Sequence, residues 1–279
     1  MIWKIKTRSL DLSRHAQVMG TLNVTPDSFS DGGEFEGVEK ALIHAREMIS
    51  QGAAIIDIGG ESTRPGATPV GADEEMNRTV PVIHALRSEW DGYISIDTTK
   101  ASVASAALAA GADIVNDISG LTADPEMQTV CATSDCGIVA MHMQGNPENM
   151  QDNPVYENVT EEIQAFFQER LATLNALGIS PDSICFDPGI GFGKSLAHNL
   201  ELLRNIARLA PAGSPLLLGV SRKSFLAKTT AASDPSDRDA PTTALTALTR
   251  TKGIMLHRVH AVKGNLAALR ITETLLNQK

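Results

Sequence analysis

The residues best suited to chemistry follow short apolar runs, where strands of the predicted fold end. In the segment SICFDPGIGFGKS (183–195), an apolar run ends in Asp187, and alternating glycines and a lysine follow. A phosphate-binding loop of the Walker A type needs a glycine five positions before Gly193, and that residue is Pro188. We therefore interpret the segment as a strand that ends in a carboxylate, followed by a glycine-rich loop in which Lys194 is an ordinary loop lysine.

Comparable polar residues follow the other apolar runs of the chain. A buried carboxylate without a partner is strongly unfavourable, so an ordinary core does not collect such groups. One member alone can be structural, and Asp57 and Asp117 suit the capping of a following helix. The set at the strand ends comprises Asn23, Asp57, Glu61, Ser62, Thr63, Arg64, Asp97, Asn116, Asp117, Met141, His142, Asp187, Ser221, Arg222, Lys223, Arg258 and His260.

Two kinds of binding chemistry separate within this set. Carboxylates, an amide and an ammonium suit a flat heterocycle with a guanidine-like edge, because N–H donors pair with a carboxylate and a ring carbonyl takes a donor. The residues of this group are Asp97, Asn116, Asp187 and Lys223. The second group forms a candidate anion pocket on a protein that is otherwise acidic. It consists of Asn23, Thr63, Arg64, Arg258 and His260.

Eight repeats of an apolar strand followed by an amphipathic helix position these residues. The strands are nearly continuous apolar runs, as expected of parallel strands covered on both faces. We predict an α/β fold, a TIM (β/α)8 barrel in which residues 2–12 form an N-terminal β-hairpin, as a single domain over residues 1–279. The alternative is a doubly wound open sheet. Predicted strands cover residues 18–24, 54–58, 93–97, 113–118, 138–143, 183–187, 216–221 and 254–260.

The predicted helices connect these strands, and two of them contain a proline signal. Pro81 is expected to kink the helix over 73–90 or to divide it into two pieces. The helical region over 223–252 is expected to be interrupted near Asp234-Pro235. The other helices are predicted over 36–51, 100–110, 125–133, 157–177, 196–210 and from about 261 to 276.

Composition narrows the class of protein. The 279 residues carry a net charge of -9, which argues against nucleic acid or an anionic membrane as partner. The three cysteines have no CxxC spacing and are expected to be buried thiols in a reducing compartment. No apolar run approaches membrane-spanning length, so we expect a soluble, cytoplasmic protein. His142 and His260 have no companions at zinc-ligand spacing.

Longer motifs at the strand ends carry a family resemblance. TLNVTPDSFSDGG, DIGGESTRPGA, SIDTTK, IVNDISG, MHMQGNP, FDPGIGFGKSLAHN, GVSRKSF and RVH follow one another along the chain. In this order they resemble the dihydropteroate synthase family of bacterial folate synthesis, over essentially the whole chain. The resemblance implies a pterin-binding TIM barrel that joins 6-hydroxymethyl-7,8-dihydropterin diphosphate to p-aminobenzoate, giving 7,8-dihydropteroate and diphosphate. It also implies magnesium as cofactor, a homodimer and competition by sulfonamides.

The resemblance assigns roles position by position. For the pterin it implies Asp97, Asn116, Ile118, Met141, Asp187, Phe192, Gly219 and Lys223. For the diphosphate it implies Asn23, Thr63, Arg64, Arg258 and His260, with Asn23 as the magnesium ligand. For p-aminobenzoate it implies Phe29, Thr63, Pro65, Phe192 and Ser221. The catalytic residues it implies are Asp97, Lys223, Arg258 and His260.

Two positions depart from the pattern of the family. Ala261 stands where the family commonly has Asp, which weakens any role for an acid beside His260. Residues 241–244 read Pro-Thr-Thr-Ala instead of Gly-Ser-Leu-Ala, on a helix that contributes to the dimer contact in the family. We see no inserted residue near Pro65 or Phe192, so sensitivity to sulfonamides is expected.

Three other functions use part of the same residues. A methyltetrahydrofolate-binding methyltransferase domain would use the Asp and Asn cluster but has no need for the anion pocket. A pterin-binding protein without catalysis would be expected to lose the anion-site arginine or the loop motifs, which this chain retains. A Schiff-base aldolase would use Lys223 and be trapped by borohydride in the presence of substrate.

Overall fold

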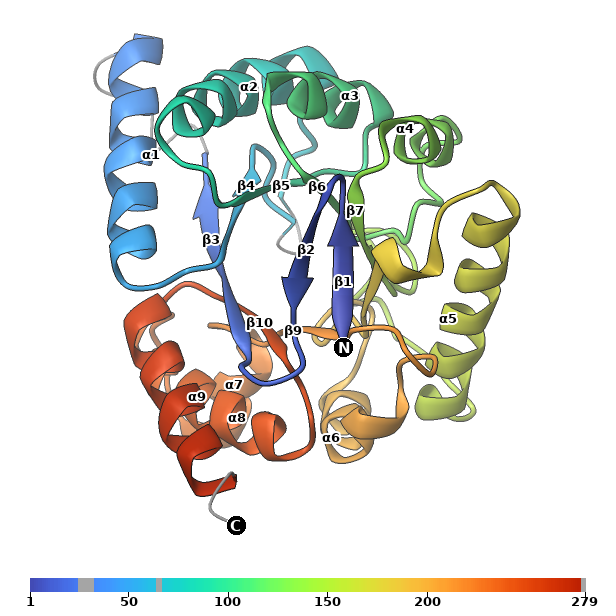
Figure 1. Cartoon of the computed structure of the whole chain (residues 1–279). Helices are drawn as coiled ribbons and strands as arrows, with labels where there is room; N and C mark the ends of the chain where they lie inside the picture. Colours follow the sequence, from blue (N-terminus) through green and yellow to red (C-terminus); the bar gives the residue numbers. More distant parts are fainter. Residues whose placement is uncertain (25–32, 64–66, 277–279) are drawn as a thin grey trace.

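The computed structural model describes residues 1–24, 33–63 and 67–276. In this part of the chain an antiparallel hairpin precedes eight parallel strands that are surrounded by helices, which confirms the predicted barrel (Figure 1). The barrel strands are β3 (Gln17–Asn23), β4 (Ile55–Gly59), β5 (Tyr93–Asp97), β6 (Ile114–Asp117), β7 (Gly137–Met141), β8 (Ile184–Asp187), β9 (Leu217–Gly219) and β10 (Leu256–Val259).

The sheet closes on itself, so the open-sheet alternative is wrong. Its strand order is β8-β7-β6-β5-β4-β3-β10-β9, and β10 pairs in parallel with β3, placing Leu256 opposite Gln17. The remaining seam between β8 and β9 is closed by a bridge between Phe186 and Leu216. The backbone N–H of Phe186 donates to the carbonyl of Pro215 at 3.0 Å. Closure brings the ends of all eight strands to one rim.

The helices form a ring outside the strands (Figure 1). They are α1 (Gly33–Ser50), α2 (Ala72–Glu89), α3 (Ala101–Ala110), α4 (Met127–Ser134), α5 (Val159–Ala176), α6 (Leu196–Asn205), α7 (Ser224–Thr230), α8 (Asp239–Thr251) and α9 (Val262–Leu276). Short 3₁₀ turns lie at Pro181–Ser183 (η2), Ile206–Arg208 (η3) and Ser236–Arg238 (η4). The predicted interruption near Asp234-Pro235 is confirmed, because α7 ends at Thr230 and α8 begins at Asp239.

Helix α2 continues through Pro81 as a single helix, so the predicted division into two pieces is wrong, whereas the predicted kink stays a prediction. Pro81 is exposed, and so is Asn77, whose carbonyl would otherwise bond to the backbone N–H at position 81. Water can therefore satisfy the carbonyl that proline leaves without a donor. On the opposite face of the helix Val82, Ile83 and Leu86 are fully buried, and this packing keeps the two halves in one helix.

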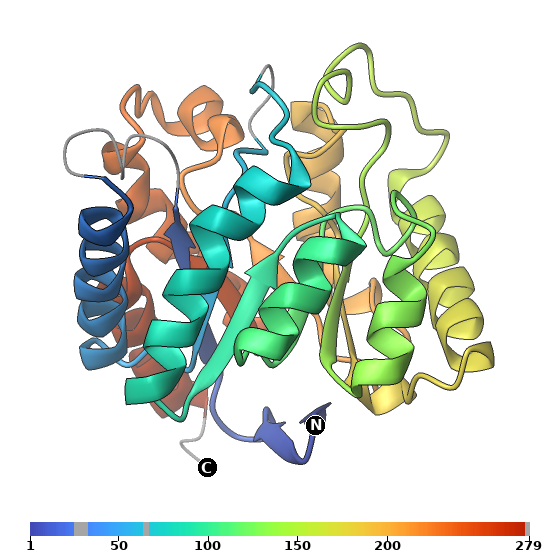
Figure 2. The same ribbon diagram turned by 90° about the horizontal axis from the view of Figure 1, so that it is seen from above.

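The hairpin of β1 (Ile2–Ile5) and β2 (Arg8–Asp11) seals the end of the barrel where the strands begin. Figure 2 shows it on the side opposite the loops that follow the strands. Trp3 is fully buried, and its indole N–H donates to the carbonyl of Ser183 at 2.9 Å. With Trp3, the apolar floor consists of Ile5, Leu10, Leu12, Met19, Ile55, Ile114, Val139, Cys185, Leu217 and Leu256.

The larger apolar core lies between the strands and the helices. It includes alternate strand residues such as Ile56, Ile58, Ile94 and Ile96, which point away from the barrel axis. Neighbouring residues such as Ile55 belong to the floor inside the barrel. This alternation decides which residues can reach the opposite rim, because the side-chain period of a strand is two.

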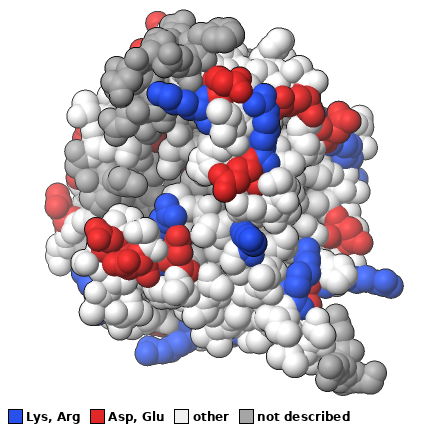
Figure 3. Space-filling view, turned by 90° about the vertical axis from the view of Figure 1, so that its left-hand side faces the viewer, with Lys and Arg blue, Asp and Glu red and all other residues white. Residues whose placement is uncertain are grey.

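On the described part of the face in Figure 3, acidic and basic side chains are interspersed. The described helices include none that is long and apolar enough to cross a membrane. All three cysteines are buried free thiols, as predicted.

Candidate active site

The predicted site residues end the inward-facing series of the barrel strands. Every second residue of a strand faces the inside of the barrel. On β5 this series runs from Tyr93 at the floor to Asp97, and on β10 it runs from Leu256 to Arg258. The pairing register links several of them directly, since Asp97 lies opposite both Gly59 and Asn116. The positions reached in this way are Asn23, Gly59, Asp97, Asn116, Met141, Asp187, Gly219 and Arg258.

Arg258 is the centre of a buried network that crosses the mouth of the barrel, which is the end where the eight strands finish. Its Nε donates to Oδ2 of Asp57 at 2.6 Å, and one terminal nitrogen donates to Oδ2 of Asp97 at 2.7 Å. Asn116 donates through Nδ2 to the same oxygen of Asp57 at 3.1 Å. Asp57 is fully buried, so it lies beneath the site and holds an arginine and an amide that point upward.

Asp57 therefore differs from its sequence interpretation as a helix cap. Asp57 bonds to Arg258 on the eighth barrel strand and to Asn116 on the fourth. Both partners are distant in sequence, so no local pattern predicts these contacts. Asp117 does act locally, because its Oδ1 accepts from the backbone N–H of Ser119 at 2.7 Å and from the Ser119 hydroxyl at 2.6 Å.

The electrostatics of the network set the charge of Asp97. Burial raises the pKa of Asp97 to about 7, Arg258 opposes this shift, and Asp57 adds to it. Burial also disfavours the charged form of Arg258, but Asp57 and Asp97 outweigh it and raise the pKa of the guanidinium. The arginine is thus permanently charged, and Asp97 titrates near neutrality beside it.

Asp187 and Lys223 form the other side of the mouth. A Cβ atom added to Gly219 would lie 3.5 Å from Oδ2 of Asp187 and 3.9 Å from Nζ of Lys223, so the two groups face the same space. Burial raises the pKa of Asp187, and Lys223 opposes the shift. Burial lowers the pKa of Lys223 to about 8, against the effect of Asp187. Gly219 has no side chain and so adds no atoms between the carboxylate and the ammonium.

The loop after β8 lies over this pair. Nζ of Lys223 donates to the carbonyl of Ile190 and lies 4.5 Å from the ring centre of Phe192. The backbone N–H of Gly189 donates to Oδ1 of Asp187 at 2.7 Å. Two other predicted pterin residues are nearly buried, since Ile118 is 5% exposed and Met141 is 4% exposed.

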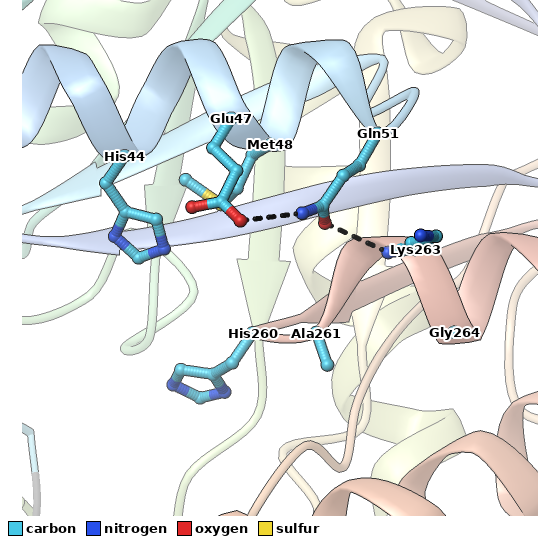
Figure 4. A pocket seen from close by; sticks show the side chains of 8 residues that line it. All are labelled: His44, Glu47, Met48, Gln51, His260, Ala261, Lys263 and Gly264. Carbon is cyan, nitrogen blue, oxygen red and sulfur yellow. Dashed lines mark hydrogen bonds between the residues drawn. The ribbon is translucent and has the colours of Figure 1, made fainter.

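Ser221 and His260 are joined at the end of the seventh and eighth barrel strands. The Ser221 hydroxyl lies 2.9 Å from Nδ1 of His260 and accepts from the His260 backbone N–H at 3.2 Å. His260 also lines an open cavity of about 270 Å³ between α1 and α9 (Figure 4). In Figure 4 its ring lies on the same side of this cavity as His44.

Comparison with known proteins places this geometry in a family. The family model described as pterin binding enzyme matches residues 19–260. A dihydropteroate synthase of Synechocystis sp. is 46% identical over 265 residues, which are 95% of this chain and 92% of the relative. One of Escherichia coli K12 is 43% identical over 271 residues, 97% of this chain and 95% of the relative. The chain belongs to the dihydropteroate synthase family of pterin-binding enzymes.

Solved structures of the dihydropteroate synthase family share the whole fold. The Yersinia pestis dihydropteroate synthase in a sulfonamide drug complex has a TM-score of 0.92 and 43% identity, with 99% of each chain covered. The Xanthomonas albilineans dihydropteroate synthase with 4-aminobenzoic acid has a TM-score of 0.90 and 40% identity, covering 98% of this chain and 97% of that chain. The fold predicted from the family resemblance is therefore shown.

Some of the residues that the dihydropteroate synthase resemblance assigns cannot be placed. Phe29, Arg64 and Pro65 lie outside the described residues. Asn23 ends β3 at the mouth, and a Cβ on Gly59 would lie 3.9 Å from its Oδ1 and 3.7 Å from Oδ2 of Asp97. Thr63 is half-buried in the loop that follows β4.

Lys100, which sequence reasoning missed, anchors the loop between β4 and α2. Nζ of Lys100 lies 2.5 Å from Oε2 of Glu61 and 2.6 Å from Oε2 of Glu75, which is fully buried. The other oxygen of Glu61 accepts from the backbone N–H of Val70 at 2.8 Å. Lys100 thus fixes the start and the end of the loop that carries Thr63. Only its position three residues after Asp97 linked it to the mouth in sequence.

Lys194 is the other correction, because the structure buries a residue that we interpreted as an ordinary loop lysine. It is 3% exposed. Its amine lies 3.1 Å from Nδ1 of His142. The glycines around it had suggested a flexible exposed loop, and no sequence signal distinguished it from a solvated lysine.

Proposed function

We propose that the protein joins 6-hydroxymethyl-7,8-dihydropterin diphosphate to p-aminobenzoate, giving 7,8-dihydropteroate and diphosphate. The observation that carries the proposal is the barrel mouth, where Asp97, Asn116, Asp187, Lys223 and Arg258 converge. The relatives at 43–46% identity over nearly the whole chain are dihydropteroate synthases, which supports this reaction.

The pterin ring is proposed to bind between Asp187 and Lys223. Its guanidine-like edge carries N–H donors that pair with a carboxylate, and its ring carbonyl accepts from an ammonium. Asn116 adds an amide that is held in orientation by Asp57. Gly219 places no side chain between these groups, which favours a flat ring there.

Asp97 is proposed to stabilise the reacting carbon. Departure of diphosphate takes the electron pair of the C–O bond and leaves a methylene cation conjugated to the pterin ring. The arylamine nitrogen of p-aminobenzoate then forms the new C–N bond and loses a proton. An ionised Asp97 near the ring offsets the developing positive charge, and the paired Arg258 favours that ionised form.

The diphosphate is proposed to leave toward Arg258, Asn23, Thr63 and His260, with Arg64 from the part of the loop outside the described residues. Magnesium fits this donor set, because it prefers phosphate oxygens and water to an all-protein cage and needs few protein oxygens. Asn23 offers one amide oxygen at the mouth. Among the described residues no cluster of three His, Cys, Asp or Glu side chains is placed to hold a metal. Bound magnesium would neutralise charge on the departing diphosphate.

p-Aminobenzoate is proposed to bind beside Ser221 and Phe192, with Phe29, Thr63 and Pro65 completing its site. Structures of relatives contain 4-aminobenzoic acid or a sulfonamide drug, which supports this ligand class. We propose that sulfonamides compete with p-aminobenzoate here. Turnover that stays undiminished by excess sulfonamide, at p-aminobenzoate near its Michaelis constant, would contradict the proposal.

A homodimer is proposed to form over α8 and α9, which pack side by side. Leu248 on α8 and Ile271 and Leu275 on α9 are each more than half exposed, at 52%, 59% and 66%. Exposed apolar side chains on neighbouring helices favour association with a second copy. Residues 241–244 lie in α8, so the departure there falls on this surface. Light scattering of Leu248→Glu against the wild type tests the proposal, and an unchanged dimer mass contradicts it.

The reaction is tested by an assay of diphosphate release with and without p-aminobenzoate. We expect rapid release with both substrates, accompanied by 7,8-dihydropteroate. We also expect slow release by hydrolysis when p-aminobenzoate is omitted, and loss of this slow release in Asp97→Asn. A strict requirement for p-aminobenzoate would contradict the dissociative mechanism, and failure to form dihydropteroate would contradict the function. Borohydride with substrate should trap no adduct at Lys223.

A further inference from the structure

Lys194 is surrounded by hydrogen-bond acceptors inside the molecule. Its Nζ lies 3.1 Å from Nδ1 of His142, 3.3 Å from the His142 carbonyl oxygen and 2.9 Å from the Phe192 carbonyl oxygen. Burial, with a further contribution from Lys223, lowers the pKa of Lys194 well below its ordinary value. The three acceptors give the buried amine hydrogen-bond partners in place of water. His142 directly follows β7, whereas Lys194 ends the loop after β8. The lysine therefore ties two neighbouring loops of the mouth together.

His142 is suited to be the acceptor in this pair. Burial, with a further contribution from Lys194, lowers the pKa of His142 to about 3, so the imidazole is neutral at physiological pH. A neutral ring with its proton on Nε2 offers a lone pair at Nδ1. Phe166 packs edge-on against the ring with 5.0 Å between ring centres, which holds its orientation.

The loop after β8 leaves no room between itself and the segment that follows β7. Gly189 has a φ of 63°, and an added Cβ would lie 1.9 Å from the carbonyl oxygen of His142. Gly193 has a φ of 57°, and an added Cβ would lie 2.5 Å from the carbonyl oxygen of Gln144. Both positions need glycine for the backbone conformation and for the close approach. Lys194 adds to this contact between the two loops, because its amine bonds to the carbonyls of His142 and Phe192.

The opposite edge of this loop touches the proposed pterin residues. The carbonyl of Ile190 accepts from Nζ of Lys223, and the Phe192 ring lies 4.5 Å from the same nitrogen. The N–H of Gly189 donates to Asp187 at 2.7 Å. Any shift of the loop away from His142 would therefore move the partners of both Lys223 and Asp187.

We propose that Lys194 is a positioning residue for the pterin site, which acts through the loop by fixing the ammonium of Lys223 and the carboxylate of Asp187. This inference rests on the proposed function, because the ligand whose binding it controls is the pterin ring. Lys194 holds the loop in place through the contacts of its buried amine with three acceptors. The amine of Lys194 contacts His142 and the Phe192 carbonyl, and it interacts with Asp187 and Lys223 through their charges.

A double-mutant cycle on ligand affinity tests the inference. The dissociation constant of 6-hydroxymethyl-7,8-dihydropterin is measured by calorimetry for the wild type, Lys194→Met, Lys223→Met and the double variant. Methionine keeps the length of the side chain and removes its donors. We expect each single variant to bind about tenfold more weakly. The double variant should lose clearly less affinity than the product of the two single losses, because the part of the effect that passes through Lys223 is already lost, while the part that passes through Asp187 remains.

The control is Lys228→Met, which removes an exposed lysine from the neighbouring helix α7 and should leave the affinity unchanged. Losses that multiply in the double variant, or no loss in Lys194→Met, would overturn the inference while the proposed function stands. A wild type that binds no pterin would instead overturn the proposed function, and this inference with it.

A second cycle covers the case in which Lys194→Met does not fold. His142→Gln removes the ring acceptor and retains a polar side chain at the same place. Combined with Lys223→Met, it should show the same lack of additivity. The Michaelis constant for the pterin diphosphate should rise in His142→Gln while that for p-aminobenzoate changes little. Equal changes in both constants would overturn the inference.

Discussion

The two ends of the barrel are built from the same strands but differ in the chemistry of their inward-facing residues. At the closed end Met19, Ile55 and Ile114 pack beneath Trp3 with no polar group among them. Between the two ends, Thr21 Oγ1, Asp57 Oδ1 and Ser95 Oγ are buried without a hydrogen-bond partner among the described residues. Within a few residues along one strand, apolar packing that stabilises the fold gives way to buried polar groups without partners, which cost free energy.

The largest effect on stability is expected at the closed end. Trp3→Ala removes a fully buried indole and its hydrogen bond to Ser183, and should lower the free energy of unfolding by about 3–5 kcal/mol. Denaturant unfolding measures this loss. If the two ends are separate in function, the variant should still bind pterin with unchanged affinity at low temperature.

Trp3→Phe is the matched control for this variant. It retains an aromatic ring and loses only the indole N–H, so it should cost less than Trp3→Ala. A pterin affinity that falls with stability in both variants would show that the floor of the barrel contributes to the site.

At the mouth, a substitution is expected to reduce catalysis and to increase stability. Asp97→Asn should reduce kcat about 100- to 1,000-fold, because it removes a charge aimed at the developing cation. The pKa of Asp97 is raised from 3.8 to about 7 by burial. The native state therefore holds its proton more tightly than the unfolded chain, and stability is lost as the pH rises through this range. Asparagine should thus raise the melting temperature at a pH above about 7.

Steady-state kinetics and thermal unfolding of Asp97→Asn measure the two effects on one preparation. Thermal unfolding at two pH values provides an internal control, because the gain in melting temperature of Asp97→Asn should shrink below the pKa of Asp97. A variant that loses both activity and stability at alkaline pH would show that Asp97 belongs to the structural framework.

The pH dependence of kcat/KM tests the ionisation states of Asp97 and Lys223 at the mouth. Asp97 must be ionised, so the rate should rise through about pH 7, the raised pKa of that group. Lys223 must be protonated, so the rate should fall above about pH 8, the lowered pKa of its amine. Lys223→Arg should shift the alkaline limb upward, because a guanidinium stays charged there. A profile without an inflection contradicts these assignments.

The smallest effect concerns the first turn of α9. Ala261 precedes this helix and has no side chain to cap it, and the amide oxygen of Gln51 accepts from the N–H of Lys263 at 3.2 Å instead. Ala261→Asp should raise the free energy of unfolding by about 1 kcal/mol, because aspartate is a good N-cap. Gln51→Ala should cost less in that background than in the wild type.

This cap prediction places a stability effect beside His260, at the rim of the mouth. Thermal unfolding of the four variants of the cycle is the measurement. Additive effects would show that Gln51 does not replace the missing cap. A large change in catalysis in Ala261→Asp would show that the acid contributes to the site.

The sequence predicted the barrel well, because each of the eight units contains its own strand, helix and turn signals. The inward-facing set followed from the strand ends, since the period of two extends from Leu256 to Arg258 and from Tyr93 to Asp97. The partners of these residues did not follow. Asp57 is 201 positions from Arg258, and their contact exists only once the barrel is closed.

Loop residues were the least predictable part of the site. The burial of Lys194 depends on two glycines that bring backbone within contact distance of the neighbouring loop, which composition alone does not indicate. Lys100 was hidden for another reason, since its carboxylate partners Glu61 and Glu75 come from a loop and a helix that precede it. In both cases long-range packing determines the environment of the charge.

The pairing of β10 with β3 has a consequence for protein synthesis. β10 is made after the other seven barrel strands, and it pairs with β3 on one side and β9 on the other. Until it leaves the ribosome, these two strands present open edges. Asp57 and Asp97 also lack their guanidinium until then. Before β10 is made, the nascent barrel therefore has both unpaired strand edges and carboxylates without their guanidinium partner.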